Sequence, residues 1–139
     1  MKVAIVGASI GGLTLALLLN QRGIEAEVWE AVSEIKPLGV GINLLPHAVK
    51  ELTELGLANA LADIAIETSS LSYYNKFGQI IWHEPRGRAA GYGWSQFSIH
   101  RGDLQMILLR VAQQYLGDSK IHTSHTLESL TQSKESVAL

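Results

Sequence analysis

A short glycine-containing turn lies between two apolar runs near the start of the chain. The sequence GASIGG at residues 7–12 follows the strand-like run 3–6 and precedes the helix-like run 13–19. A strand that turns at once into a helix needs a residue free to take unusual backbone angles, and Gly7 supplies it. Gly12 would let the helix approach the strand closely. The arrangement predicts the strand, turn and helix that open a dinucleotide-binding βαβ unit.

The middle glycine of the usual pattern is replaced in this chain by Ser9. Serine is small, and its hydroxyl group can donate a hydrogen bond to a phosphate. The unpaired amide groups and the positive dipole end of a helix starting near Gly11 also favour an anion. The turn is therefore still expected to bind a diphosphate.

The residues after the turn supply the context that the glycine pattern needs. The helix-like run is apolar all round, and Gly23 stands where a left-handed helix cap is expected. Residues 24–29 then alternate apolar and polar, which predicts a strand closed by Glu30. An acid about 20 residues after the turn is typical of one that binds ribose hydroxyls. A secretory signal is the alternative, but the glycines interrupt the apolar run and no small-residue cleavage site follows.

Composition limits the classes of function. The chain has 139 residues, enough for one domain with a core, and a net charge of -2 at pH 7, which favours neither nucleic acid nor an anionic membrane. It has no cysteine, which excludes disulfides and cysteine-bound metals. His122 and His125 would lie on opposite faces of a strand, so a shared metal site is not expected. A soluble cytoplasmic protein is expected.

The segment 33–43 contains Pro37, Gly39 and Gly41. Such closely spaced glycines indicate either tight turns, the commoner case, or a backbone pressed against a flat ligand. A helix opened by Pro46 and ended by Gly56 is expected next, followed by a second short helix over 57–64.

The second half of the chain predicts further elements. Residues 71–83 favour a β-hairpin, and loop 85–94 is expected to be solvated or to cover a ligand. A short strand at 97–100 leads into a helix that ends at Gly117. At this junction Arg101 could clamp a phosphate or form a surface ion pair with Asp103, and local chemistry does not separate the two.

Several segments together carry a resemblance to a known family. They read GASIGGLTLALLL, VWEA, EIKPLGVGINLLPHAV, ELGL, EPRG and SIHRGDLQMILL. The chain resembles the FAD-dependent aromatic hydroxylases, which are single-component flavoprotein monooxygenases of the p-hydroxybenzoate hydroxylase type, and within them it is most similar to phenazine hydroxylases. The implied fold is α/β: a Rossmann-like FAD-binding βαβ unit with part of a parallel sheet and an inserted β-hairpin, truncated before the substrate domain.

The resemblance also implies site residues for FAD. The turn would surround the pyrophosphate, Glu30 would bind the adenosine ribose, and the residues after it would lie on the adenine side. The implied cofactor contacts are Gly7, Ser9, Gly11, Gly12, Glu30, Ala31, Gly41, Ile42, Asn43, Arg101 and Leu127. In this set, residues 41–43 lie beside the flavin half, the arginine reaches the ribitol and phosphates, and the leucine offers its backbone to adenine.

The family's chemistry is hydroxylation of an aromatic ring. NADH or NADPH reduces the flavin, O2 forms a flavin hydroperoxide, and its distal oxygen passes to the substrate. We nominate no catalytic acid or base in this chain. The small aromatic substrate is expected to be phenazine-like or another aromatic carboxylate.

Length is where the chain departs from the family. Such enzymes are about two to three times longer, so residues 1–139 are expected to be the N-terminal part of an FAD-binding domain without the substrate domain. An incomplete parallel sheet would expose apolar surface and favour self-association. Two alternative functions remain. One is an NAD-dependent Rossmann oxidoreductase, but ordinary dehydrogenases have no use for the HRGDLQ segment. The other is a non-enzymatic remnant that binds no nucleotide.

Overall fold

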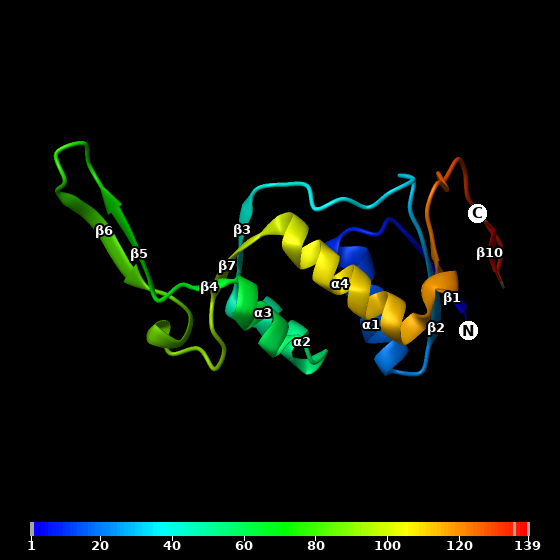
Figure 1. Cartoon of the computed structure of the whole chain (residues 1–139), viewed down its shortest axis with the longest axis horizontal. Helices are drawn as coiled ribbons and strands as arrows, with labels where there is room; N and C mark the ends of the chain where they lie inside the picture. Colours follow the sequence, from blue (N-terminus) through cyan, green and yellow to red (C-terminus); the bar gives the residue numbers. More distant parts are fainter. Residues whose placement is uncertain (1, 135, 139) are drawn as a thin grey trace. The chain divides into compact units, whose positions relative to one another are not determined.

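The computed structural model describes residues 2–134 and 136–138. The chain forms two compact units, and each is described by itself. The first unit comprises the residues up to Lys36 and those from Gln105 onward, and the second comprises Pro37–Leu104. The chain passes from the second unit back to the first within the helix α4 (Arg101–Leu116), whose first four residues belong to the second unit (Figure 1).

The first unit is built on a parallel sheet. Its elements are β1 (Lys2–Val6), α1 (Ile10–Gln21), β2 (Glu25–Trp29), η2 (Asp118–Lys120), β8 (Ile121–His122), β9 (Thr131–Gln132) and β10 (Val137–Ala138). The strands β1, β2 and β8 pair in parallel in that order, while β9 and β10 pair antiparallel. A positive φ of +69° at Gly23 ends the turn after α1. These elements confirm the predicted βαβ unit.

Side chains of the first unit divide between the two faces of this sheet. Paired residues of parallel strands share a face, so Val3 and Ala26 lie on one side while Ala4 and Glu27 lie on the other. The first of these faces, together with α1 and the later part of α4, supplies the core. Its buried residues are Ile5, Leu13, Ala16, Leu17, Ala26, Val28, Leu108, Leu109 and Ala112. The opposite face carries charged and aromatic side chains.

The second unit contains a separate antiparallel sheet and a hairpin. Its elements are β3 (Gly41–Leu44), α2 (Pro46–Glu54), α3 (Ala58–Ile64), β4 (Ile66–Glu67), β5 (Ser70–Tyr74), β6 (Ile80–Pro85), η1 (Gly87–Ala90) and β7 (Phe97–His100). The sheet has the order β3-β7-β4. The segment 33–43 is not wholly a loop as predicted, because its last three residues begin β3 and pair with β7.

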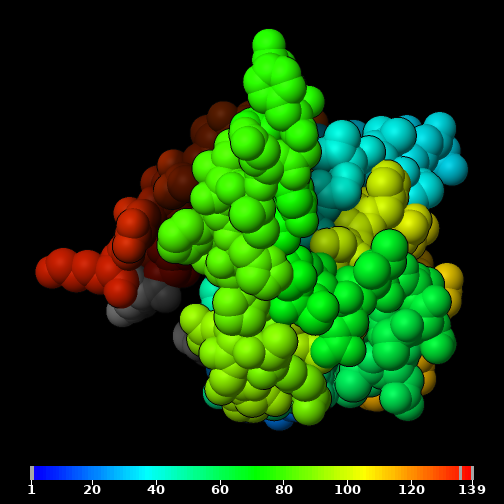
Figure 2. Space-filling model, turned by 90° about the vertical axis from the view of Figure 1, so that its left-hand side faces the viewer, coloured from blue at the N-terminus to red at the C-terminus, as the bar shows by residue number. Residues whose placement is uncertain are grey.

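The predicted hairpin is formed by β5 and β6. Tyr73 lies directly opposite Trp82, and both side chains are more than half exposed, at 55% and 56%. The hairpin extends away from the helices α2 and α3 of the same unit (Figures 1 and 2). These exposed side chains give the hairpin an apolar surface that the other described residues leave largely uncovered.

Within the described residues, no helix is long and apolar enough to cross a membrane.

Candidate functional site

Two glycines shape the turn between β1 and α1: Gly7 takes a left-handed backbone conformation, and Gly12 allows the helix to pack closely on the turn. Gly7 has φ +99°, and its N–H donates to the carbonyl oxygen of Trp29 at 2.7 Å, which ties the turn to the end of β2. A Cβ atom on Gly12 would lie 2.0 Å from the carbonyl oxygen of Gly7 and 3.4 Å from the Cγ2 atom of Ile5. The helix thus approaches the strand at a distance that only glycine allows, as expected from the sequence.

The start of α1 presents an open polar surface. Ser9 precedes the helix in an extended conformation and is exposed, and its side chain makes no capping hydrogen bond within the described part of the chain. A Cβ atom on Gly11 would have only the Ser9 hydroxyl oxygen near it, at 4.0 Å. The first amide groups of a helix have no partner within that helix. Space, amide donors and a hydroxyl group therefore meet at one helix end, as anion binding requires.

The carboxylate of Glu30 lies against the same turn. Its Oε2 atom accepts the N–H of Ala8 at 2.7 Å, and its Oε1 atom accepts the N–H of Val32 at 3.1 Å. The hydrogen bonds from the backbone N–H groups of Val32 and then Ala8 lower the pKa of this carboxyl group. Glu30 is therefore ionised at neutral pH, and each oxygen keeps acceptor capacity for a hydroxyl group. Ala31 follows it and is exposed.

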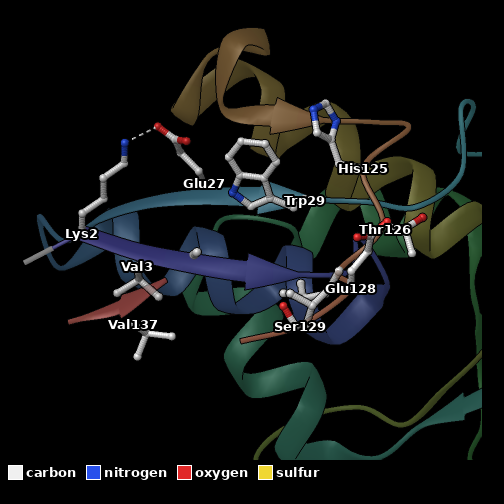
Figure 3. A pocket seen from close by; sticks show the side chains of 12 residues that line it. Lys2, Val3, Glu27, Trp29, His125, Thr126, Glu128, Ser129 and Val137 are labelled. Carbon is white, nitrogen blue, oxygen red and sulfur yellow. Dashed lines mark ion pairs between the residues drawn. The ribbon is translucent and has the colours of Figure 1, made fainter. Parts of the chain in front are cut away.

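A cavity of about 650 Å³ lies beside the outward face of β1 and β2. The close-up shows Lys2, Glu27 and Trp29 along one side and Thr126, Glu128 and Ser129 from the chain after β8 along another (Figure 3). Leu127 also lines it, as does Val6. Val6 and Trp29 immediately precede Gly7 and Glu30, so the cavity and the glycine turn share the carboxyl ends of these two strands.

Trp29 lies in a cluster of rings. It stacks on His122 with centroids 3.9 Å apart and meets His125 edge-on at 5.0 Å. The two histidines were expected on opposite faces only if their segment formed a strand; β8 ends at His122, so this condition is not met and the two rings lie 5.9 Å apart. Among the residues that the structure describes, no group of three or more potential metal ligands is present.

Glu27 is the centre of a charged cluster on the outward face of the sheet. Its carboxylate pairs with Lys2 at 2.8 Å, Lys120 at 3.0 Å and His122 at 3.3 Å. Hydrogen bonds from the two lysines, led by Lys2, lower the pKa of this group to about 2. The cluster ties β1, β2 and β8 together at their outward face.

In the second unit, the predicted flavin-side residues form the edge of a sheet. Gly41, Ile42 and Asn43 of β3 pair with His100, Ile99 and Ser98 of β7. No atom of the described chain lies within 4 Å of where a Cβ on Gly41 would be, so the backbone is open to approach there.

The glycine-rich segment before β3 packs on the start of α4. A Cβ on Gly102 would lie 2.3 Å from the carbonyl carbon of Pro37. Gly39, with φ +136°, would place a Cβ 3.1 Å from that of Arg101. These glycines therefore serve close packing within this unit, beyond the turn and ligand roles weighed from the sequence.

The side chain of Arg101 is directed to the backbone of the same segment. Its Nη1 atom donates to the carbonyl oxygen of Leu38 at 3.3 Å, and its own N–H donates to that of Val40 at 3.0 Å. Asp103 lies instead 3.5 Å from the Nδ1 atom of His100. The structure therefore does not show the ion pair between Arg101 and Asp103, which was one of the two roles considered for this arginine.

Two polar contacts were missed by the sequence interpretation. The Ser98 hydroxyl donates to the Oδ1 atom of Asn43 at 2.8 Å, and Gln105 donates to the carbonyl oxygen of Ala8 at 2.8 Å. The first leaves the amide nitrogen of Asn43 as a donor. A glutamine in the HRGDLQ segment was the available signal for the second.

The chain is similar to known flavoenzymes. It is 48% identical over 122 residues to the phenazine 1,6-dicarboxylic acid hydroxylase PhzS of Lysobacter antibioticus, covering 87% of this chain and 30% of that protein. It is 37% identical over 115 residues to the 3-amino-4-hydroxybenzoate 2-monooxygenase of Streptomyces cremeus, covering 78% of this chain and 28% of that protein. The chain thus spans about a third or less of the length of these relatives.

Solved structures agree in fold. A variant of HpxO from Klebsiella pneumoniae, crystallised with FAD, matches 99% of this chain and 34% of its own with a TM-score of 0.79 and 26% identity. The p-nitrophenol 4-monooxygenase PnpA from Pseudomonas putida shares the fold with a TM-score of 0.85 at 20% identity, over 97% of this chain and 34% of its own. Residues 1–138 match the FAD binding domain family. The chain therefore belongs to that family, as an FAD-binding domain of the flavoprotein aromatic hydroxylases.

Proposed function

We propose that the first unit binds the adenosine diphosphate part of FAD. The observation that carries this proposal is the placement of the Glu30 carboxylate against the N–H of Ala8, within the turn that opens α1. A negative acceptor for ribose hydroxyls then lies beside the amide donors for the pyrophosphate. In this proposal Gly7, Ser9, Gly11 and Gly12 surround the pyrophosphate, and two further residues, Ala31 and Leu127, line the adenine side.

The flavin half is proposed to contact the second unit. Gly41 and Ile42 would offer backbone, and the open space at Gly41 supports such an approach. Asn43 would offer its amide nitrogen, since Ser98 already donates to its amide oxygen. Arg101 would bind the phosphates and ribitol, because a guanidinium group suits phosphate oxygens.

We propose that the whole protein is an NADH- or NADPH-dependent monooxygenase that hydroxylates a small aromatic substrate, phenazine-like or another aromatic carboxylate. The names of the relatives support this, since they describe hydroxylases and monooxygenases of aromatic acids. Bound FAD supplies the redox chemistry with O2, while residues of this chain bind and orient it. The 139-residue chain, as the N-terminal part of such a protein, is proposed to be inactive or weakly active alone.

Self-association is a further part of the proposal. Tyr73 and Trp82 form an exposed aromatic pair, and Ile81 beside them is 66% exposed. Exposed apolar sheet surface favours contact with a second copy. Light scattering at tens of micromolar tests this, and a monodisperse monomer would contradict it.

A flavin titration tests the central part. FAD is added to the purified chain while flavin fluorescence is followed; FMN is titrated in the same way, and NAD, which gives no flavin signal, is added as a competitor of FAD. FMN has the isoalloxazine ring without the adenosine half, and NAD has that half without a flavin. Saturable binding of FAD that is stronger than binding of FMN supports the proposal. Equal binding of FAD and FMN, or no binding by a folded chain, would overturn it.

A further inference from the structure

We propose that Gln105 is a positioning residue for the pyrophosphate-binding turn, a role that rests on the proposed function. Its side chain comes from α4, far along the sequence, yet its Nε2 atom donates to the carbonyl oxygen of Ala8 at 2.8 Å. Both residues belong to the first unit. The contact therefore holds the turn from a second helix.

Both backbone polar atoms of Ala8 are held by side chains. Glu30 accepts its N–H at 2.7 Å, and Gln105 donates to its carbonyl oxygen. Ala8 is fully buried, so water does not replace the hydrogen bond that its N–H or C=O group loses when a side chain is removed. Two side chains thus fix the peptide groups on either side of this residue.

The consequence falls on the amide of Ser9. A trans peptide is planar, and its C=O and N–H point in opposite directions. Because Gln105 holds the C=O of Ala8, the N–H of Ser9 in the same peptide group points away from that glutamine side chain. Ser9 is exposed and immediately precedes the first residue of α1. Gln105 therefore sets the direction of a donor at the surface proposed to bind the pyrophosphate.

Without this hydrogen bond, the carbonyl oxygen of Ala8 would be free to repel a bound anion. An unheld Ala8–Ser9 peptide could rotate and present its oxygen, which carries partial negative charge, toward the ligand. The amide group of glutamine prevents this without adding a charge near the phosphates. A carboxylate at position 105 would lack the donor and repel the carbonyl oxygen.

Gln105→Glu tests the proposal, since it replaces only the NH2 group by oxygen and keeps the shape of the side chain. The matched control is Gln113→Glu, which adds the same charge to an exposed position on the same helix. Gln105→Met gives a second, uncharged removal of the donor. FAD affinity is measured by fluorescence titration, and the amide resonance of Ser9 is measured by NMR in the ligand-free proteins.

Both Gln105 variants are expected to bind FAD about fivefold to tenfold more weakly than the unchanged chain. This is the effect of losing one hydrogen bond, here the proposed one from the Ser9 N–H to the pyrophosphate. They should also shift the Ser9 amide resonance, while Gln113→Glu changes neither quantity. If the unchanged chain binds FAD and the Gln105 variants bind equally well, the positioning role is wrong and the proposed function stands. If the folded, unchanged chain does not bind FAD, the proposed function and this inference both fail.

Discussion

Gly12→Ala is expected to destabilise the chain, whereas Gly11→Ala in the same helix turn is not. The new methyl carbon at position 12 would lie 2.0 Å from the carbonyl oxygen of Gly7 and 3.2 Å from its carbonyl carbon. Carbon–oxygen contacts between unbonded groups usually measure about 3.3–3.6 Å. The helix must therefore move by more than about 1 Å from the turn, or the turn itself must be rebuilt.

The magnitude follows from the nature of the obstructing atoms. Overpacking a core typically costs about 1–3 kcal/mol when side chains can adjust. The obstacle at position 12 is backbone, which cannot rotate away, so we expect a loss of about 3 kcal/mol or more in the free energy of unfolding. At position 11 the nearest atom is 4.0 Å away, and alanine is expected to raise that free energy by up to about 1 kcal/mol.

Urea denaturation followed by circular dichroism measures both variants. The changes in unfolding free energy are expected to have opposite signs at two adjacent glycines, which composition or helix propensity alone would not produce. A Gly12→Ala chain whose unfolding free energy stays within about 0.5 kcal/mol of the unchanged chain would refute it. So would a Gly11→Ala chain that loses as much as Gly12→Ala.

Three further predictions concern charge and packing. Glu30→Ala should weaken FAD binding by about 1–3 kcal/mol through loss of a charged hydrogen bond, and an unchanged dissociation constant in the fluorescence titration would remove its ribose role. Glu27→Gln should lower the free energy of unfolding by about 1–2 kcal/mol near neutral pH, since solvent screening limits the effect of its ion pairs. Because folding lowers the pKa of Glu27 from 4.5 to about 2, its stabilisation is present above about 4.5 and is lost as pH falls through about 2. Urea melts at both ends of that range test this, and a gap between the two proteins that does not close in acid would contradict it. Gly102→Ala should destabilise the second unit, because its Cβ would meet Pro37 at 2.3 Å, while Gly41→Ala should leave stability unchanged. Equal melting temperatures for these two variants would contradict the packing argument.

Features determined by neighbours in sequence could be predicted well. The turn at residues 7–12, the cap at Gly23 and the strand that ends before Glu30 depend on short-range backbone preferences, and the structure contains them. The helix that ends at Gly117 was also predicted, but its apolar residues are not all covered, since the Tyr115 side chain is 60% exposed. Spacing identifies a helix, but which of its positions are covered depends on what packs against it.

Features that join distant segments could not be predicted. Gln105 and Ala8 are separated by 97 residues, and Ser98 and Asn43 by 55. The strand β3 exists because β7 pairs with it, and its short sequence after closely spaced glycines did not by itself indicate a strand. The approach of His125 to Trp29 likewise depends on where β8 ends. Each of these contacts depends on which distant segments meet in the folded chain, and the local sequence pattern does not determine that.

The assignment of FAD to the glycine turn is tested most directly by an NMR titration of the isotope-labelled chain with FAD. The account predicts saturable shifts at the amides of Gly7, Ser9, Gly11 and Gly12, with the same dissociation constant as the fluorescence titration. Riboflavin, which has neither a phosphate nor the adenosine half, should leave these amides unmoved. Binding of FAD that shifts other amides and spares this turn would contradict the account, as would the absence of any shift.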